Sequence, residues 1–160
     1  MRLFAYLGGG ILALALALFA GLVATIRTGY RPVLDRVRHF NRAYTNPKVM
    51  RTAGEPGASA SIIRHTGRSS GRQYETPVGV MEVGDDYLIT LPYGTSADWV
   101  KNVLAAGAAE VVHEGRTVPV GDPELVSAGV VSTGVPAREI LTQRLYGIDQ
   151  MLRLRPRPSV

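Results

Sequence analysis

The residues best suited to bind an anion lie in one short stretch, residues 65–72, which reads HTGRSSGR. Its two glycines permit a tight loop whose backbone N–H groups can converge on a single anion. Its two arginines carry planar guanidinium groups that match phosphate oxygens, and its serines add hydroxyl donors. The stretch is a candidate phosphate loop, although an ordinary solvated turn with incidental arginines fits the composition equally well. The glycines are Gly67 and Gly71, the arginines are Arg68 and Arg72, and the hydroxyl donors are Thr66, Ser69 and Ser70.

The sequence offers few side chains for other kinds of catalysis. The chain has no cysteine, which excludes disulfides, thiolate nucleophiles and sulfur-ligated metals. Its three histidines, His39, His65 and His113, do not have the spacing of metal ligands, so we expect no metal site. The carboxylates are scattered along the chain, and a hydrolase pair is not evident.

Short strands and helices are expected to position the loop. Alternating apolar residues between turn signals predict the strands, and residues 95–98 match a capping box that begins a helix with Gly107 as its stop. Strands joined by hairpins, with a helix after the third strand, predict a small antiparallel barrel rather than a parallel sheet. We expect strands at residues 60–66, 74–83, 87–91, 109–113, 116–120 and 126–132, and helices at residues 97–106, 136–146 and 148–154.

The N-terminal segment has the character of a membrane span. Residues 3–26 form a run of 24 residues without a charge. As a helix this run is about 36 Å long, enough to cross a hydrocarbon core of about 30 Å. The alternative is a cleaved signal peptide, but the run exceeds the usual apolar core of about 7–15 residues and only Arg2 precedes it. We therefore predict a single-pass helix in the cell membrane.

The charge distribution gives the orientation of that helix. Residues 27–51 hold seven basic residues and one acidic residue, whereas the rest of the chain from residue 52 holds ten basic and twelve acidic residues. The positive-inside rule then places the C-terminal domain in the cytoplasm. A slightly acidic body argues against nucleic acid as a partner. Within the basic stripe, Val33, Val37 and Phe40 recur at helical spacing and predict an amphipathic helix that caps one end of the barrel.

The order of these motifs resembles a known family. The loop is followed by Thr76 and Pro77, then by a hairpin, and then by a helix that begins Asp98-Trp99 and carries Asn102. This succession resembles the nitroreductase family that depends on the deazaflavin coenzyme F-420, over roughly residues 39–121. The resemblance implies a mainly β fold with flanking helices, an antiparallel split β-barrel of the type that binds flavin mononucleotide. The N-terminal transmembrane helix predicted above lies outside the resemblance and completes the expected fold class.

The resemblance also implies a role for each matching residue. Five loop residues would hold the phosphodiester of the cofactor: Gly67, Arg68, Ser69, Gly71 and Arg72. Thr76 and Pro77 would flank the chromophore. Its polar edge would face backbone groups of Thr90, Leu91, Pro92 and Tyr93. The pocket would be closed from the helix by Asp98, Trp99 and Asn102.

The implied activity is that of an oxidoreductase. It would transfer a hydride from reduced coenzyme F-420 to a lipophilic acceptor such as a quinone or a nitro compound. The cofactor carries this chemistry, so the protein need supply only binding, orientation and shielding. Tyr93 is a candidate proton donor, with water as the stronger alternative. A flavin mononucleotide enzyme of the same barrel type and a non-enzymatic, membrane-tethered module that binds a cofactor or lipid remain alternatives.

The expected organisation has four parts and three partners. Residues 1–26 form the transmembrane anchor, residues 27–52 a basic amphipathic helix and linker, residues 53–135 the cofactor-binding split barrel, and residues 136–160 C-terminal helices and a tail. The expected partners are the small lipophilic acceptor, the membrane and, because split barrels commonly pair, a second copy of the chain.

Overall fold

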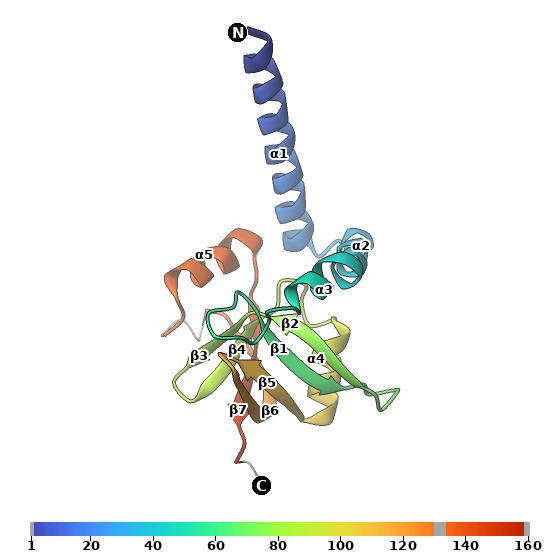
Figure 1. The fold of residues 1–160 in the computed structure, drawn as a ribbon, viewed down its shortest axis with the longest axis vertical. Coiled ribbons are helices and arrows are strands. Elements are labelled where there is room, and N and C mark those ends of the chain that lie inside the picture. Colours follow the sequence, from blue (N-terminus) through green and yellow to red (C-terminus); the bar gives the residue numbers. More distant parts are fainter. Residues whose placement is uncertain (1, 130–133, 159–160) are drawn as a thin grey trace.

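The body of the protein is one curled antiparallel sheet of seven strands, from which a long N-terminal helix rises (Figure 1). The computed structural model describes residues 2–129 and 134–158. The strand order β2-β1-β5-β6-β7-β4-β3 forms a half-barrel with flanking helices, which confirms the expected fold class. The strands are β1 Ser61–Thr66, β2 Gln73–Val78, β3 Val80–Val83, β4 Asp86–Thr90, β5 Ala108–His113, β6 Arg116–Ser127 and β7 Gln150–Pro156.

The helices lie at one end and one side of this sheet. The helix α1 leads to the mixed helix α2–η1–α3 beside the foot of α1, and α5 lies on the other side of that foot (Figure 1). The helix α4 connects β4 to β5. The helices are α1 Arg2–Thr28, α2 Arg31–Phe40, η1 Asn41–Thr45, α3 Asn46–Val49, α4 Asp98–Ala106 and α5 Ala137–Tyr146.

One continuous segment of chain supplies both edges of the sheet. The expected single strand at residues 74–83 is wrong, because the chain breaks at Gly79 into β2 and β3. The strand β2 pairs with β1 at one edge, and β3 pairs with β4 at the other. The two edges must therefore approach each other at Gly79, which forces the sheet to curl.

The C-terminal segment forms a strand in the sheet, and the helix expected at residues 148–154 is wrong. The strand β7 pairs with β6 on one side and β4 on the other, and Met151, Leu152 and Leu154 are fully buried. Leu, Met and Arg favour helices locally, but pairing on both sides outweighs this weak preference. The barrel thus extends to Pro156, beyond the predicted boundary at residue 135.

The strand expected at residues 116–120 and the first two residues of the strand expected at 126–132 belong to one strand, whereas Ala128 and Gly129 form a turn. The strand β6 runs without interruption through Ser127, and its pairing with β7 shifts register between Gly121 and Glu124. Asp122 has a positive φ of 49° within this bulge. A bulge of this kind bends a strand and lets it follow the curl of the barrel. Residues 130–133 of the second predicted strand lie outside the described residues.

The basic amphipathic helix covers one end of the barrel, as expected, and its helical structure runs from Arg31 to Val49. It widens into a π-helical turn, in which the N–H of Asn46 donates to the carbonyl of Asn41, and then continues to Val49. The following Pro47 has no N–H with which to close a normal turn. The wide turn is a local adjustment of the helix ahead of this proline.

The helix α4 has the predicted stop but not the predicted cap. Gly107 ends it in the left-handed conformation with a φ of 67°. The capping box expected at residues 95–98 is wrong, because the N-cap residue is Ala97 and no side chain bonds to the first turn. Ser96 instead accepts a hydrogen bond from Arg38 of α2 at 2.9 Å.

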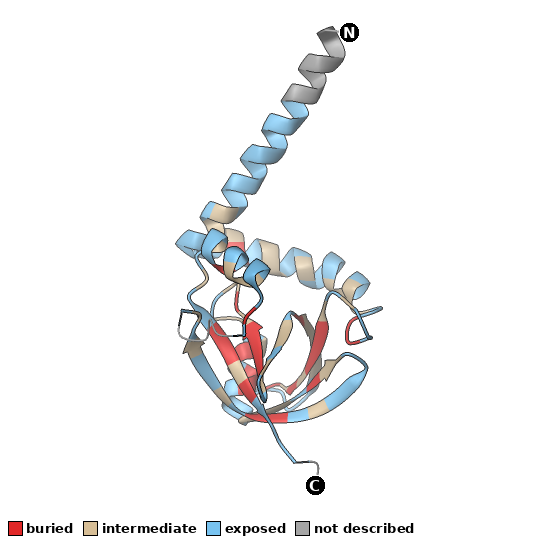
Figure 2. Cartoon of the chain, turned by 90° about the vertical axis from the view of Figure 1, so that its left-hand side faces the viewer, coloured by how far each residue is buried: buried red, intermediate tan, exposed pale blue. Residues whose placement is uncertain are grey.

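The core fills the inside of the half-barrel, where Figure 2 shows buried residues on the strands beneath the exposed helix α1. Trp99 of α4 packs against this core. The cluster contains Ile63, Val78, Tyr87, Ile89, Leu91, Val100, Val103, Val111, Val120, Leu152 and Leu154.

The helix α1 touches the body only at its foot. Arg27 donates to the carbonyl of Arg144 in α5 at 2.7 Å. The stretch Gly10–Thr28 has a mean hydropathy of 2.1, and none of it is buried. It is the one helix among the described residues that is long and apolar enough to cross a membrane, which by itself is weak evidence for a span.

The central position of β7 predicts that shortening the side chain of Leu152 lowers the stability of the protein strongly. Leu152→Ala should lower the free energy of unfolding by about 2–5 kcal/mol, because it removes a fully buried side chain. Leu141→Ala, the same change on an exposed residue of α5, should cost less than about 0.5 kcal/mol. The measurement is urea unfolding of the full chain in detergent micelles, followed by the fluorescence of Trp99, the single tryptophan. Equal effects of the two changes would contradict a central β7.

Candidate functional site

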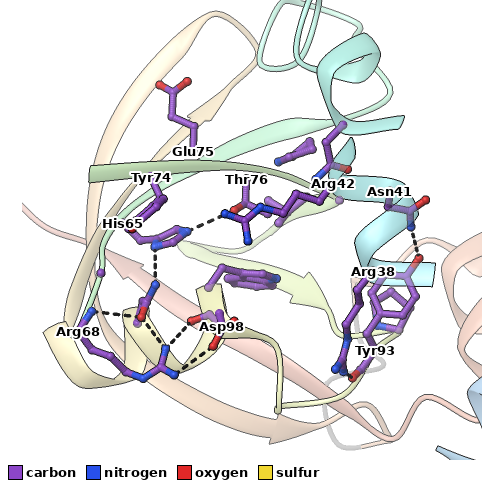
Figure 3. A pocket seen from close by; sticks show the side chains of 18 of the residues that line it. Arg38, Asn41, Arg42, His65, Arg68, Tyr74, Glu75, Thr76, Tyr93 and Asp98 are labelled. Carbon is purple, nitrogen blue, oxygen red and sulfur yellow. Dashed lines mark hydrogen bonds and ion pairs between the residues drawn. The ribbon is translucent and has the colours of Figure 1, made fainter. Parts of the chain in front are cut away.

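The largest group of predicted site residues surrounds one cavity of about 580 Å³ (Figure 3). The loop after β1 and the strand β2 form one wall, and the end of β4 with the start of α4 forms another. The helix segment α2–η1 covers the remaining side. A volume of this size is typical of sites for small molecules and cofactors.

The loop that bounds the cavity is a tight turn with unused donors. The N–H of Gly67 donates to the carbonyl of Arg72 at 2.8 Å, and the N–H of Gly71 donates to the carbonyl of Gly67 at 2.8 Å. Glycine is required at position 67, where a Cβ would meet the hydroxyl oxygen of Ser70 at 2.5 Å. Within the part of the chain that the structure describes, the amides of Ser69 and Ser70 have no acceptor. These two amides are available to an anion.

Arg68 is exposed, but its side chain is fixed to α4 by hydrogen bonds (Figure 3). Its guanidinium donates to the side-chain oxygen of Asn102 at 2.8 Å and to the carboxylate of Asp98 at 3.0 Å. Its backbone N–H donates to the same oxygen of Asn102 at 3.2 Å. Three predicted site residues from two distant segments are therefore joined directly. The ion pair itself is largely exposed and adds little stability, so its main effect is to orient the guanidinium.

A buried network links this loop to the cavity floor. The side-chain oxygen of Asn102 faces Arg68, so its NH₂ group faces Nδ1 of His65 and donates to it at 3.2 Å. Nδ1 then acts as the acceptor, and the protonated Nε2 donates to the hydroxyl of Thr76 at 3.2 Å. Burial lowers the pKa of His65 below its ordinary value, because the charged imidazolium loses solvation. His65 is thus neutral at physiological pH and serves as a hydrogen-bonding spacer.

Tyr93 lies at the opposite end of the cavity and is held by α2–η1. Its phenol oxygen accepts a hydrogen bond from the side chain of Asn41 at 2.8 Å, and its carbonyl accepts one from Arg38 at 2.5 Å. Burial raises the pKa of Tyr93, which keeps the phenol protonated. Because Asn41 is the donor in the first bond, the phenol proton of Tyr93 is not engaged in it.

Most predicted cofactor-binding residues meet at this cavity. Leu91 belongs to the hydrophobic core instead, and the lining includes neither Gly71 nor Arg72 of the loop. Which of these residues contact a ligand stays a prediction. The predicted residues that line the cavity are Gly67, Arg68, Ser69, Thr76, Pro77, Thr90, Pro92, Tyr93, Asp98, Trp99 and Asn102.

Sequence reasoning missed the contribution of α2–η1. Arg38, Asn41 and Arg42 all line the cavity, although their positions in the sequence indicate only a basic amphipathic helix. Arg42 extends from η1 into the cavity (Figure 3). It has no ion-pair or hydrogen-bond partner among residues 2–129 and 134–158, so its charge is available to a ligand. The basic stripe at residues 27–51 was the available signal, but its direction depends on how the helix packs.

Comparison with known proteins gives one family match. The model of the F420H(2)-dependent quinone reductase family matches residues 36–127. This range contains the loop, β2, the end of β4 and α4. A search of the curated proteins finds no match.

Several solved structures are similar to the chain. An F420-H2 dependent reductase shares 14% identity over 61% of this chain and 94% of its own, with a TM-score of 0.45. A second F420 reductase shares 13% identity over 68% of this chain and 92% of its own, with a TM-score of 0.43. HutZ, a heme storage protein of Vibrio cholerae, shares 12% identity over 71% of this chain and 90% of its own, with a TM-score of 0.47.

The buried neutral His65 predicts a loss of stability in mild acid. Its pKa is lowered in the folded state, so its stabilising contribution is complete above the ordinary value of 6.5 and declines as the pH falls toward the folded pKa. The free energy of unfolding should therefore fall more steeply between about pH 6.5 and 5 in the wild type than in His65→Gln. His39→Gln, a change at an exposed residue, is the control and should keep the wild-type slope. Equal slopes in the wild type and His65→Gln would refute a buried neutral His65.

Proposed function

The chain belongs to the F420H(2)-dependent quinone reductase family, and we propose that it transfers a hydride from reduced coenzyme F-420 to a quinone dissolved in the membrane. Membership confirms the resemblance to a deazaflavin-dependent oxidoreductase family that the loop and the tryptophan helix indicate. The family match favours the deazaflavin and gives no support to flavin mononucleotide. A nitro compound is the second candidate acceptor, on the resemblance alone.

The observation that carries the proposal is that the cavity combines anion-binding groups with an apolar part. The free amides of Ser69 and Ser70 and the charge of Arg42 suit the phosphate and acidic tail of the coenzyme. Trp99 and Pro77 line the space between them and suit a flat ring system. The residues present therefore fit the cofactor.

The residues of the chain would bind and shield the reacting partners. When bound, reduced coenzyme F-420 supplies the hydride, and the quinone needs one further proton to become a hydroquinone. Tyr93 holds a proton at its hydroxyl on the cavity wall, because Asn41 donates to the phenol oxygen and burial raises its pKa. Tyr93 is accordingly the proposed proton donor, and water is the alternative. The lid α2–η1 would exclude bulk water from the apolar part of the cavity.

The location at the membrane is part of the proposal. The apolar stretch Gly10–Thr28 supports a single-pass anchor, and the basic residues that follow it support a cytoplasmic domain. An anchor would keep the cavity close to a lipid-soluble acceptor. A homodimer stays a prediction.

Cofactor binding should depend on Arg68 but not on an arginine outside the cavity. Arg68→Ala should weaken coenzyme F-420 binding about tenfold or more, which corresponds to about 1.4 kcal/mol, because it removes a cavity-lining cation and loosens the loop from α4. Arg116→Ala is the control. Arg116 lies on β6, is exposed and forms an ion pair as Arg68 does, and its removal should leave cofactor binding unchanged. The measurement is a fluorescence titration of the full chain in micelles, with flavin mononucleotide as a second ligand.

A second pair of variants tests the loop without disturbing its contacts to α4. Ser69→Asp places a carboxylate beside the proposed phosphate site and should abolish tight binding by charge repulsion. Ser127→Asp adds the same charge to an exposed residue at the end of β6 and should have no effect. Tight binding in Ser69→Asp would show that the loop does not hold the phosphate.

The anchor predicts how the chain fractionates. The full chain should stay in the membrane fraction after washes with high salt and alkaline carbonate, and a variant that lacks residues 2–28 should move to the soluble fraction. The intact mass of the membrane form reports whether the helix is retained or cleaved. Membrane retention of the truncated variant would contradict anchoring by α1.

A further inference from the structure

A second cavity of about 1000 Å³ lies between the body and the foot of α1. Its walls come from α1, α2 and α5, from the loop before β1, and from β3. The apolar and small residues of its lining are Leu22, Ile26, Val37, Gly57, Ala58, Ala60, Gly79, Val80, Met81 and Pro92. Its charged lining residues, Glu114, Arg138 and Glu139, come from the β5–β6 turn and α5.

The two cavities meet at a common wall. Asn41, Gly79, Thr90, Pro92 and Tyr93 line both of them. The hydrogen bond between Asn41 and Tyr93 lies in this wall. Gly79 leaves it thin, because a Cβ at that position would meet nothing within 4 Å. A molecule in the second cavity can therefore present one end to the proposed proton donor.

The other side of the second cavity is the apolar helix itself. Leu22 and Ile26 of α1 line it, and both belong to the stretch Gly10–Thr28 that can span a membrane. The helices α2 and α5 flank the foot of α1 on either side (Figure 1). The cavity thus opens where the chain would leave the bilayer.

The two cavities adjoin different parts of the fold. The loop at residues 67–71, which bounds the first cavity, lies at the tip of the β1–β2 hairpin and points away from α1 (Figure 1). An anionic cofactor can approach from that side, through water. A lipid-soluble molecule can approach from the α1 side without crossing water, since the wall there is formed by apolar side chains of the span.

We infer that the second cavity is the binding site for the apolar tail of a quinone that enters from the bilayer between α1 and α5. This inference rests on the proposed function and adds the acceptor's chemical class, a quinone with a polyprenyl tail, and its route. The tail occupies the space lined by Leu22, Ile26 and Val80, and the ring reaches the common wall at Tyr93. The volume of the second cavity is larger than that of the first, as a chain of several isoprene units requires.

The test uses a variant whose new side chain fills the second cavity and leaves the lining of the first cavity unchanged. Thr142→Phe projects a ring from α5 into the second cavity, of which Thr142 is a lining residue. Leu141→Phe introduces the same side chain one position earlier, at a residue that is 69% exposed and outside both linings. Ala58→Phe fills the opposite wall from the loop before β1 and replaces Thr142→Phe if that variant fails to fold.

Binding is measured first, without cofactor, on the full chain in phospholipid vesicles. A naphthoquinone with a polyprenyl tail should quench the fluorescence of Trp99, the single tryptophan, in a saturable way. Thr142→Phe should raise the apparent dissociation constant at least tenfold, and Leu141→Phe should leave it unchanged. Menadione, which lacks the tail, should quench the fluorescence with the same apparent dissociation constant in Thr142→Phe and Leu141→Phe. A tailed quinone that binds both variants alike would overturn the inference.

Turnover then separates this inference from the proposed function. With reduced coenzyme F-420, the ratio of kcat/KM for the tailed quinone to that for menadione should fall at least tenfold in Thr142→Phe and stay constant in Leu141→Phe. An unchanged ratio in a protein that reduces both quinones would overturn the tail site and leave the proposed function standing. The expected binding shift without turnover of either quinone would overturn the proposed function and leave the tail site standing.

Discussion

The constraint on which the structure depends is that residues 73–83 form both edges of one sheet. A continuous segment of this length can pair with β1 on one side and β4 on the other only if the sheet curls until its edges meet. The curl places the loop after β1, the end of β4 and the start of α4 around one hollow. The break at Gly79 stays free of neighbouring side chains, and both cavities adjoin it.

The segment α2–η1 connects the apolar helix α1 to the candidate site. Arg38 and Asn41 bond to Tyr93, so the segment α2–η1 is attached to the end of β4 rather than lying loosely on the surface. The π-helical turn ahead of Pro47 supplies both Asn41 and Arg42. Such turns are frequent at functional sites because they redirect side chains within a helix. Here the turn brings the side chains of Asn41 and Arg42 to the cavity.

Local signals allowed the loop and the helix α4 to be predicted, whereas long-range pairing decided what sequence reasoning missed. Gly67 and Gly107 stand where a close approach and a left-handed stop require glycine, and such needs are visible in a sequence. Residues 150–156 read as a helix because their strand character comes only from pairing with β4 and β6. Likewise, Arg68 and Arg72 are equivalent in the sequence, and only the fold of the turn directs Arg68 to the cavity.

The sparse chemistry of the site follows from the division of labour in a cofactor enzyme. On the proposed function, the protein must bring together an anionic cofactor from water and an apolar acceptor from the bilayer, and these two requirements conflict within one opening. On this proposal the half-barrel resolves the conflict, because the hairpin loop borders one cavity and the helices α1 and α5 border the other. The common wall at Asn41 and Tyr93 is then the one place where both partners can meet. Selectivity for the acceptor would therefore depend more on the helices α1 and α5 than on the strands that hold the cofactor.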